Sequence, residues 1–338
     1  MLDNMTIKCY DEKATKHFTS DFFESKYGMV ERIGVNEYSF KLYNPDNKTS
    51  SFLRIECPHL NCKGEPVCLE ITGSIRKWWF GNKSTKDFSK QEYSAAINLL
   101  FEILEIPQKW KKNFIISKVE VGMNIYVKQP CSEILNRVTE YRSSCYLRHS
   151  HPTGIAFKAK SKEIKLYDKI EEISKKFKKK SIKDVEESQF LENNKDKNLL
   201  RIEFKINCKS ELGFNNLEDS IIFFDDLYFY FWKKLRYIKY NNNELGEFTG
   251  KNYKDFLKYL AYVGIDSLET EIFEKMIKQL NKNAKREARK LYETSSTESC
   301  SYNKFQFFRD IKIQMLYSMK ESRNLYLVKE LFLKKQSA

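Results

Sequence analysis

The chain has 338 residues, of which 41% are hydrophobic and 14% aromatic, so it can bury a sizeable core and is not an intrinsically disordered chain. Its 60 Lys and Arg residues against 46 Asp and Glu give a formal net charge of +14, which favours a polyanionic partner such as nucleic acid. A general compositional bias towards lysine would give the same charge without any partner.

The first two-thirds of the chain alternate strand-like runs with helices. Strands are expected at 36–44, 51–57, 66–74, 113–128, 153–160, 162–169 and 199–207, and helices at 87–106 and 132–142. This order predicts an α+β domain over residues 1–210, an antiparallel sheet built of two related β-α-β halves. The charged stretch 171–198 is expected to begin as a helix and continue as a mobile connection.

The remainder, residues 211–338, is expected to be an all-helical region that binds DNA or assists the first domain. Helices are predicted at 217–240, 252–263, from Leu268 onwards and within 303–333. The third of these carries a cationic stripe that would track phosphates, although a solvated face is the ordinary interpretation of such a stripe. The stripe includes Lys278, Lys282, Lys285 and Arg289.

No apolar run is long enough to cross a membrane, and the start, MLDNMTIKCYDEK, lacks the apolar region of a signal peptide. The 8 cysteines are scattered without framework spacing, so we expect reduced thiols and a cytoplasmic protein. Four residues, Cys57, His59, Cys62 and Cys68, lie close together in the sequence. They lack a tight C-x-x-C pair, so a structural zinc site is the less favoured interpretation.

Three predicted strands each carry a glutamate between apolar neighbours: Glu70, Glu120 and Glu203. If these strands are adjacent, their carboxylates would converge on a divalent cation, and carboxylates alone suit Mg²⁺ or Mn²⁺. On spacing alone, three exposed edge residues remain the commoner arrangement.

Tyr167 and Lys169 are two residues apart and would share a face of a strand. A phenol with a pKa near 10 is a poor nucleophile unless a nearby cation stabilises its phenolate. Attack by such a tyrosine on a phosphodiester would give a phosphotyrosine and release a 3′-hydroxyl.

Four stretches together resemble the replication initiators of filamentous phages and related plasmids, the gene II/X type. They are CLEITGSIRKWWFGNKSTKDFS (68–89), SKVEVGMNIYV (117–127), IKLYDKIEE (164–172) and LLRIEFKIN (199–207). Their order and spacing match that family over roughly residues 50–210, while each motif alone is common. The resemblance implies that Tyr167 is the nicking nucleophile, that Lys169 supports it, and that the three glutamates lie at the metal.

This resemblance implies a rolling-circle initiator in a bacterial host cell, which nicks and rejoins origin DNA through a 5′-phosphotyrosine. Its expected partners are origin DNA and the host helicase, polymerase and single-strand-binding protein, because the chain has no GxxxxGK[ST] nucleotide-binding loop. Arg76, Lys77, Trp78 and Trp79 are expected to contact unpaired bases, with packing of at least one tryptophan as the alternative. Arg201 is expected to pair with a carboxylate or a phosphate.

Two other functions stay open. A non-catalytic nucleic-acid-binding protein would use the same charge and would tolerate the loss of Tyr167. A relaxase-like mobilisation nickase would bind its metal through His149 and His151, but Ser150 and Pro152 make that segment read as a turn with exposed histidines.

Overall fold

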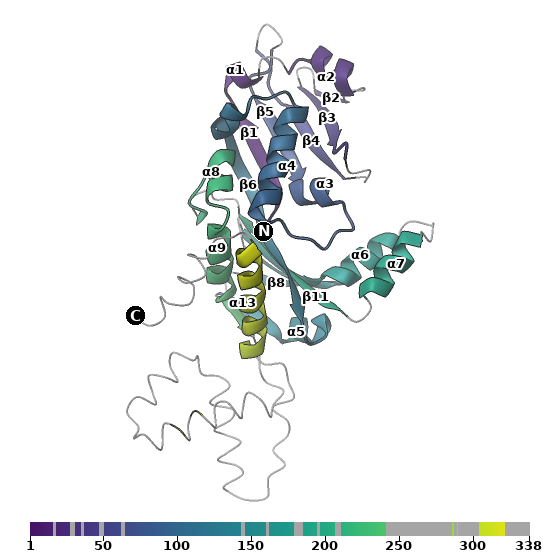
Figure 1. Ribbon diagram of the computed structural model, residues 1–338, viewed down its shortest axis with the longest axis vertical. Helices are drawn as coiled ribbons and strands as arrows, with labels where there is room; N and C mark the ends of the chain where they lie inside the picture. The colour runs from purple at the N-terminus through teal and green to yellow at the C-terminus, as the bar shows by residue number, and fades with distance from the viewer. Residues whose placement is uncertain are drawn as a thin grey trace, which may run out of the picture.

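The computed structural model describes residues 1–15, 18–27, 31–34, 37–46, 51–61, 65–142, 146–159, 162–178, 185–194, 197–206, 211–240, 286, 289 and 304–321. Its main feature is a ten-stranded sheet in which every neighbouring pair of strands is antiparallel. The predicted α+β class with a large antiparallel sheet is therefore confirmed (Figure 1).

Two strands, β1 (Leu2–Cys9) and β6 (Phe114–Val127), pair at the centre of this sheet. On one side β1 is followed in space by β5 (Leu69–Ser74), β4 (Phe52–Cys57), β3 (Glu37–Tyr43) and β2 (Glu31–Gly34). On the other side β6 is followed by β11 (Asn198–Ile206), β10 (Lys162–Asp168), β9 (Gly154–Ala159) and β8 (Leu147–His151). Each side thus has a first strand that pairs with the last strand of a meander, while a common origin of the two halves stays a prediction.

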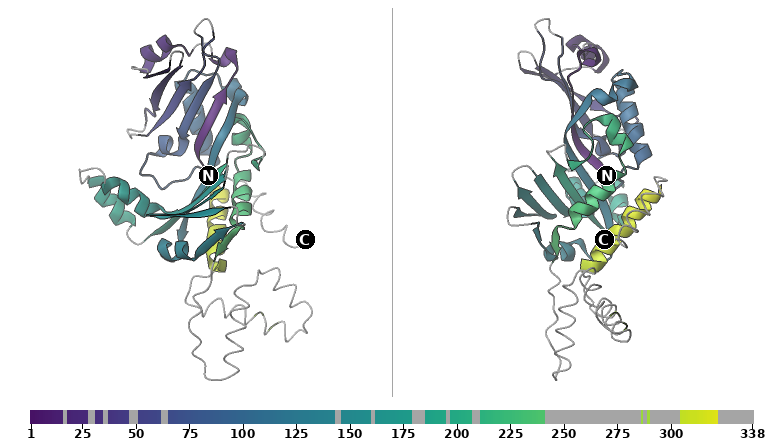
Figure 2. Two further views of the ribbon diagram at one scale, coloured as in Figure 1. Left: turned by 180° about the vertical axis from the view of Figure 1, so that it is seen from behind. Right: turned by 90° about the vertical axis from the view of Figure 1, so that its left-hand side faces the viewer.

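The helices that cover the sheet lie mainly on one of its faces (Figure 2). They are α4 (Lys90–Ile103), α8 (Leu217–Ile222), α9 (Asp226–Leu235) and α13 (Lys304–Glu321). Apolar strand residues such as Ile7, Ile71 and Phe204 point at these helices and are buried in one hydrophobic core. The opposite face, which we call the open face, carries the polar residues that alternate with them.

Shorter elements complete the fold. They are α1 (Glu12–Thr15), α2 (Ser20–Tyr27), α3 (Ile75–Phe80), the 3-10 helix η1 (Gln108–Asn113), α5 (Cys131–Arg137), α6 (Lys169–Lys178) and α7 (Val185–Asn194). Strands β7 (Val138–Tyr141) and β12 (Ile238–Tyr240) form a separate two-stranded sheet. In α4, Ser89 and Glu92 form a capping box, which explains why the helix begins three residues after the predicted start at residue 87.

Several predicted boundaries are wrong for local reasons. The predicted helix 132–142 ends at Arg137, because the β-branched residues Val138 and Thr139 continue as strand β7. The predicted helix 217–240 is interrupted at Phe223, resumes after Asp225 and gives way to strand β12, so this region is not all-helical. Most of the stretch expected to be a mobile connection forms the helices α6 and α7.

The packing does not break at residue 210, where the sequence analysis places a domain boundary. Leu212, Phe214, Phe231 and Phe307 belong to the same hydrophobic core as the sheet. The predicted helix 252–263 lies outside the described residues, as do Lys278, Lys282 and Lys285. Arg289 is helical and exposed. In the part of the chain that the structure describes, no helix is long and apolar enough to cross a membrane.

Candidate active site

The central strands β6, β11 and β10 bring a row of polar residues together on the open face. In the sheet register Asn124 is opposite Arg201, which is opposite Tyr167. In the next row Gly122 is opposite Glu203, which is opposite Lys165. Residues opposite one another in antiparallel strands share a face, so these side chains all project from the same side.

Tyr167 and Glu203 are in direct contact. The Tyr167 hydroxyl donates a hydrogen bond to Glu203 Oε1 over 3.0 Å, and Arg201 Nε donates to the same oxygen over 2.6 Å. Burial raises the pKa of Tyr167 far above its ordinary value, and the charge of Glu203 raises it further. In this arrangement Tyr167 is therefore a protonated phenol, and its proton points at a carboxylate.

Arg201 holds that carboxylate in place from beneath. Its side chain is fully buried and donates to Asp3 over 2.6 Å and to both Asp87 and Asn124 over 3.0 Å. Arg76 also pairs with Asp3, over 3.1 Å. A buried guanidinium with all its partners satisfied is rigid, so Glu203 has a fixed position relative to Tyr167.

The prediction that Arg76 and Trp78 contact DNA is wrong for this structure. Residues 75–80 form helix α3 rather than a strand, and its buried face carries Ile75, Arg76 and Trp78. Arg76 is fully buried, and its guanidinium donates to Asp3 and to the carbonyl oxygens of Ser84 and Lys86. Lys77 and Trp79 are only partly buried and keep a surface for a ligand.

Glu120 lies beside Glu203 on the open face. It is two residues from Gly122 along β6, and a side chain at Gly122 would come within 3.0 Å of Glu203 Cγ. Burial and the nearby charge of Glu203 raise the pKa of Glu120 to about 7, while Lys165 lowers it. Two neighbouring carboxylates that resist ionising together fit a divalent cation, since Mg²⁺ is commonly held by one or two carboxylates together with phosphate oxygens.

Glu70 is not brought to this pair. It pairs with Lys8 over 2.6 Å, and the β6 neighbour of Lys8 is Ile115, which is roughly 16 Å of strand away from Glu120. The predicted convergence of all three glutamates is therefore not found. Among the described residues there is no group of three or more His, Cys, Asp or Glu placed to hold a metal.

Lys169 begins helix α6 directly after the strand that carries Tyr167. It is 1% exposed, pairs with Glu172 over 2.8 Å, and its Nζ lies 5.7 Å from the centre of the Tyr167 ring. Burial lowers the pKa of Lys169 to about 8. Lys169 thus lies over the tyrosine ring, whereas the hydrogen bond of the Tyr167 hydroxyl goes to Glu203.

His149 and His151 are in a strand and not in the predicted turn. They belong to β8, at the edge of the sheet, with all five strand residues exposed. His151 is opposite Gly154, which is opposite Tyr167, so these histidines share the open face with the tyrosine. Two strand positions separate His151 from Tyr167.

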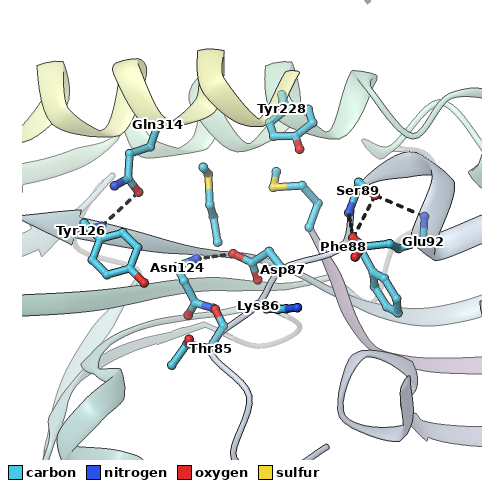
Figure 3. A pocket seen from close by; sticks show the side chains of 12 residues that line it. Thr85, Lys86, Asp87, Phe88, Ser89, Glu92, Asn124, Tyr126, Tyr228 and Gln314 are labelled. Atoms are coloured by element: carbon cyan, nitrogen blue, oxygen red, sulfur yellow. Dashed lines mark hydrogen bonds between the residues drawn. The ribbon is translucent and has the colours of Figure 1, made fainter. Parts of the chain in front are cut away.

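A cavity of about 490 Å³ adjoins the Arg201 network on its other side (Figure 3). Asp87 and Asn124 line it, and the Asn124 backbone N–H donates to Asp87 over 2.6 Å. Tyr126 and Gln314 close another side, where the Tyr126 N–H donates to the Gln314 side chain over 3.0 Å. The polar partners of Arg201 therefore also form a wall of this cavity.

Asp3, Asp87 and Asn124 were missed by sequence reasoning. Asp87 lies in a loop and Asn124 inside a strand, where single polar residues carry no recognisable pattern. Asp3 was within reach, because MTIKC alternates as a strand does and predicts that the segment around Asp3 enters the sheet.

These features define an α+β protein with a large antiparallel sheet and a tyrosine–carboxylate site on the open face. Comparison with known families finds that residues 3–222 match the family described as the N-terminal part of the gene II replication-associated protein. The chain belongs to this family, that of the replication initiators of filamentous phage gene II type. Comparison with curated proteins and with solved structures gives no match.

Proposed function

We propose that this replication initiator nicks and rejoins DNA through Tyr167. The observation that carries the proposal is the hydrogen bond from the Tyr167 hydroxyl to Glu203, a carboxylate fixed by Arg201 on the open face of the sheet. A phenol whose pKa is raised by burial needs a base close by, and Glu203 is in contact with its proton.

The reaction follows from this geometry. Tyr167 Oη attacks the phosphorus of a phosphodiester while its proton passes to Glu203, and the bond from phosphorus to the 3′-oxygen breaks. The 3′-oxygen leaves and takes a proton from water, and the 5′ side remains as a phosphotyrosine. Attack by a 3′-hydroxyl on this phosphotyrosine reverses the step and rejoins the strand.

Glu120 and Glu203 are the residues we assign to the binding of Mg²⁺ or Mn²⁺. A bound cation would neutralise charge on the phosphate and on the leaving oxygen. The raised pKa of Glu120 supports this assignment, because a cation between two carboxylates relieves their mutual repulsion. We further propose that the freed 3′-hydroxyl primes a host polymerase, with a host helicase and single-strand-binding protein acting on the displaced strand.

The test is adduct formation with end-labelled single-stranded origin DNA and Mg²⁺ or Mn²⁺. Wild-type protein is expected to form a denaturation-resistant adduct that Tyr167→Phe abolishes. Tyr126→Phe removes an exposed hydroxyl from the same face and is expected to leave the adduct unchanged. Binding without an adduct under all conditions would favour the non-catalytic alternative.

The same assay separates the mobilisation-type alternative. The double variant His149→Ala/His151→Ala is expected to keep adduct formation within about threefold of wild type, since exposed side chains contribute little to this site. A loss that excess Mn²⁺ restores would assign the metal to the histidines instead.

A further inference from the structure

An exposed pair of aromatic side chains stands on the outer part of the sheet, far from Tyr167 in sequence. Tyr43 on β3 and Phe52 on β4 are directly opposite one another, and their ring centres are 5.7 Å apart. Tyr43 is 49% exposed and Phe52 is 38% exposed. Large aromatic surface left in water on a sheet indicates a contact surface for a ligand or a partner.

Basic residues surround this aromatic pair. Lys41 and Arg54 form the next opposed pair on the same two strands, and both are exposed. The Lys41 ammonium lies 5.5 Å from the centre of the Phe52 ring. Aromatic rings next to cationic side chains bind unpaired nucleic acid, because the bases stack on the rings while the phosphates pair with the cations.

The register places the aromatic pair on the same face as the candidate active site. Arg54 is opposite Thr72, Thr72 is opposite Thr6, and Thr6 is opposite Lys118 on β6. Lys118 alternates along β6 towards Asn124, in the row of Tyr167. Between β4 and β10 there are five strand spacings, or about 24 Å across the sheet.

We infer that Tyr43 and Phe52 form a stacking platform for unpaired bases of the DNA strand that reaches Tyr167. This inference rests on the proposed function for its ligand, single-stranded DNA. The platform holds the strand at a second point on the open face, so it increases affinity for long substrates and takes no part in the chemistry at Tyr167.

The experiment compares a long and a short oligothymidylate, of about 20 and about 6 nucleotides, by fluorescence anisotropy. Tyr43→Leu/Phe52→Leu keeps apolar side chains on the strands but removes the rings. It is expected to weaken binding of the long oligonucleotide about tenfold for each stacked base. Affinity for the short oligonucleotide and adduct yield on it should stay at the wild-type level.

Phe223→Leu is the matched control, because Phe223 is a 42% exposed aromatic residue at the end of α8, on the helix-covered side. It is expected to bind both oligonucleotides as wild type does. Tyr43→Trp adds a direct readout that tolerates a weakened leucine variant: stacking should quench its fluorescence on addition of the long oligonucleotide.

The outcomes separate this inference from the proposed function. Adducts from all variants together with unchanged long-oligonucleotide affinity and no quenching would overturn the platform and leave nicking intact. A selective loss of long-oligonucleotide binding without adducts from any variant would support the platform and contradict nicking. A leucine variant that alters only self-association would make the pair a protein contact, which also overturns the inference.

Discussion

Arg201 is the residue on which the arrangement of the site depends. It pairs with Asp3, Asp87 and Glu203, and its side chain is inaccessible to solvent. Replacing it by methionine leaves these carboxylates with uncompensated charge in a buried site. We expect Arg201→Met to lower the free energy of unfolding by about 3–5 kcal/mol, measured by urea denaturation.

The control for Arg201 is an ion pair in water. Lys239 and Glu140 pair over 2.6 Å, but both are exposed. Lys239→Met should therefore change stability by less than about 1 kcal/mol. Equal losses from the two variants would mean that the buried network does not stabilise the fold.

Glu120 gives the site a defined pH dependence. Its pKa rises from 4.5 to about 7 on folding, so the folded protein holds this proton more tightly than the unfolded chain does. The favourable contribution is complete below about pH 4.5 and is lost as the pH rises through about 7. We expect Glu120→Gln to be more stable than wild type at pH 8 and to lose that advantage at pH 5, measured by urea denaturation.

Metal binding should reverse this effect. Mg²⁺ or Mn²⁺ requires ionised Glu120, so either ion should raise the melting temperature of wild type more at pH 8 than at pH 5. It should not do so for Glu120→Gln. Glu102→Gln, which neutralises an exposed carboxylate on α4, should respond to metal as wild type does. A metal response retained in Glu120→Gln would remove Glu120 from the proposed site.

At the scale of strands, Gly154 permits β9 to pack against the strand that carries Tyr167. A Cβ at this position would lie 2.1 Å from the Leu166 carbonyl oxygen and 2.5 Å from Tyr167 Cβ. Because these atoms belong to backbone and to the base of a side chain, the strands must separate. Gly154→Ala should cost about 3 kcal/mol of stability and displace Tyr167, with a loss of adduct.

Gly213→Ala is the comparison for Gly154. Gly213 has φ +76° and no atom within 4 Å of an added Cβ. It should cost only about 1 kcal/mol, from the left-handed backbone, and leave the adduct unchanged. If Gly154→Ala keeps full adduct yield, β9 does not position the tyrosine.

The elements also show what sequence patterns predict and what they miss. Strands β3, β4, β5, β6, β9, β10 and β11 match predicted runs, because their alternating apolar residues face one shared core. The pairing of Tyr167 with Arg201 was not predictable, since it follows from the order of strands rather than from any single strand. For the same reason Glu70, in a motif much like that of Glu203, lies three strand positions away from β11.

At the scale of the whole molecule, the net charge of +14 makes nucleic-acid binding plausible but does not say which face binds. The open face carries Lys118, Lys165 and Lys205 on the central strands around the candidate site. If DNA lies across this face, changing all three to glutamine removes phosphate contacts. The slope of log K against log salt for single-stranded DNA should then fall by about 2, at roughly 0.7 per contact.

A second triple variant tests whether position matters as well as charge. Lys109→Gln/Lys112→Gln/Lys233→Gln removes the same charge from exposed residues on η1 and α9. Because long-range attraction depends on total charge, both variants should lose some association rate at low salt. Only the open-face variant should lose slope, since counterions are released where lysines meet phosphates. Equal slopes would mean that the charge acts diffusely and that the open face is not the DNA-binding surface.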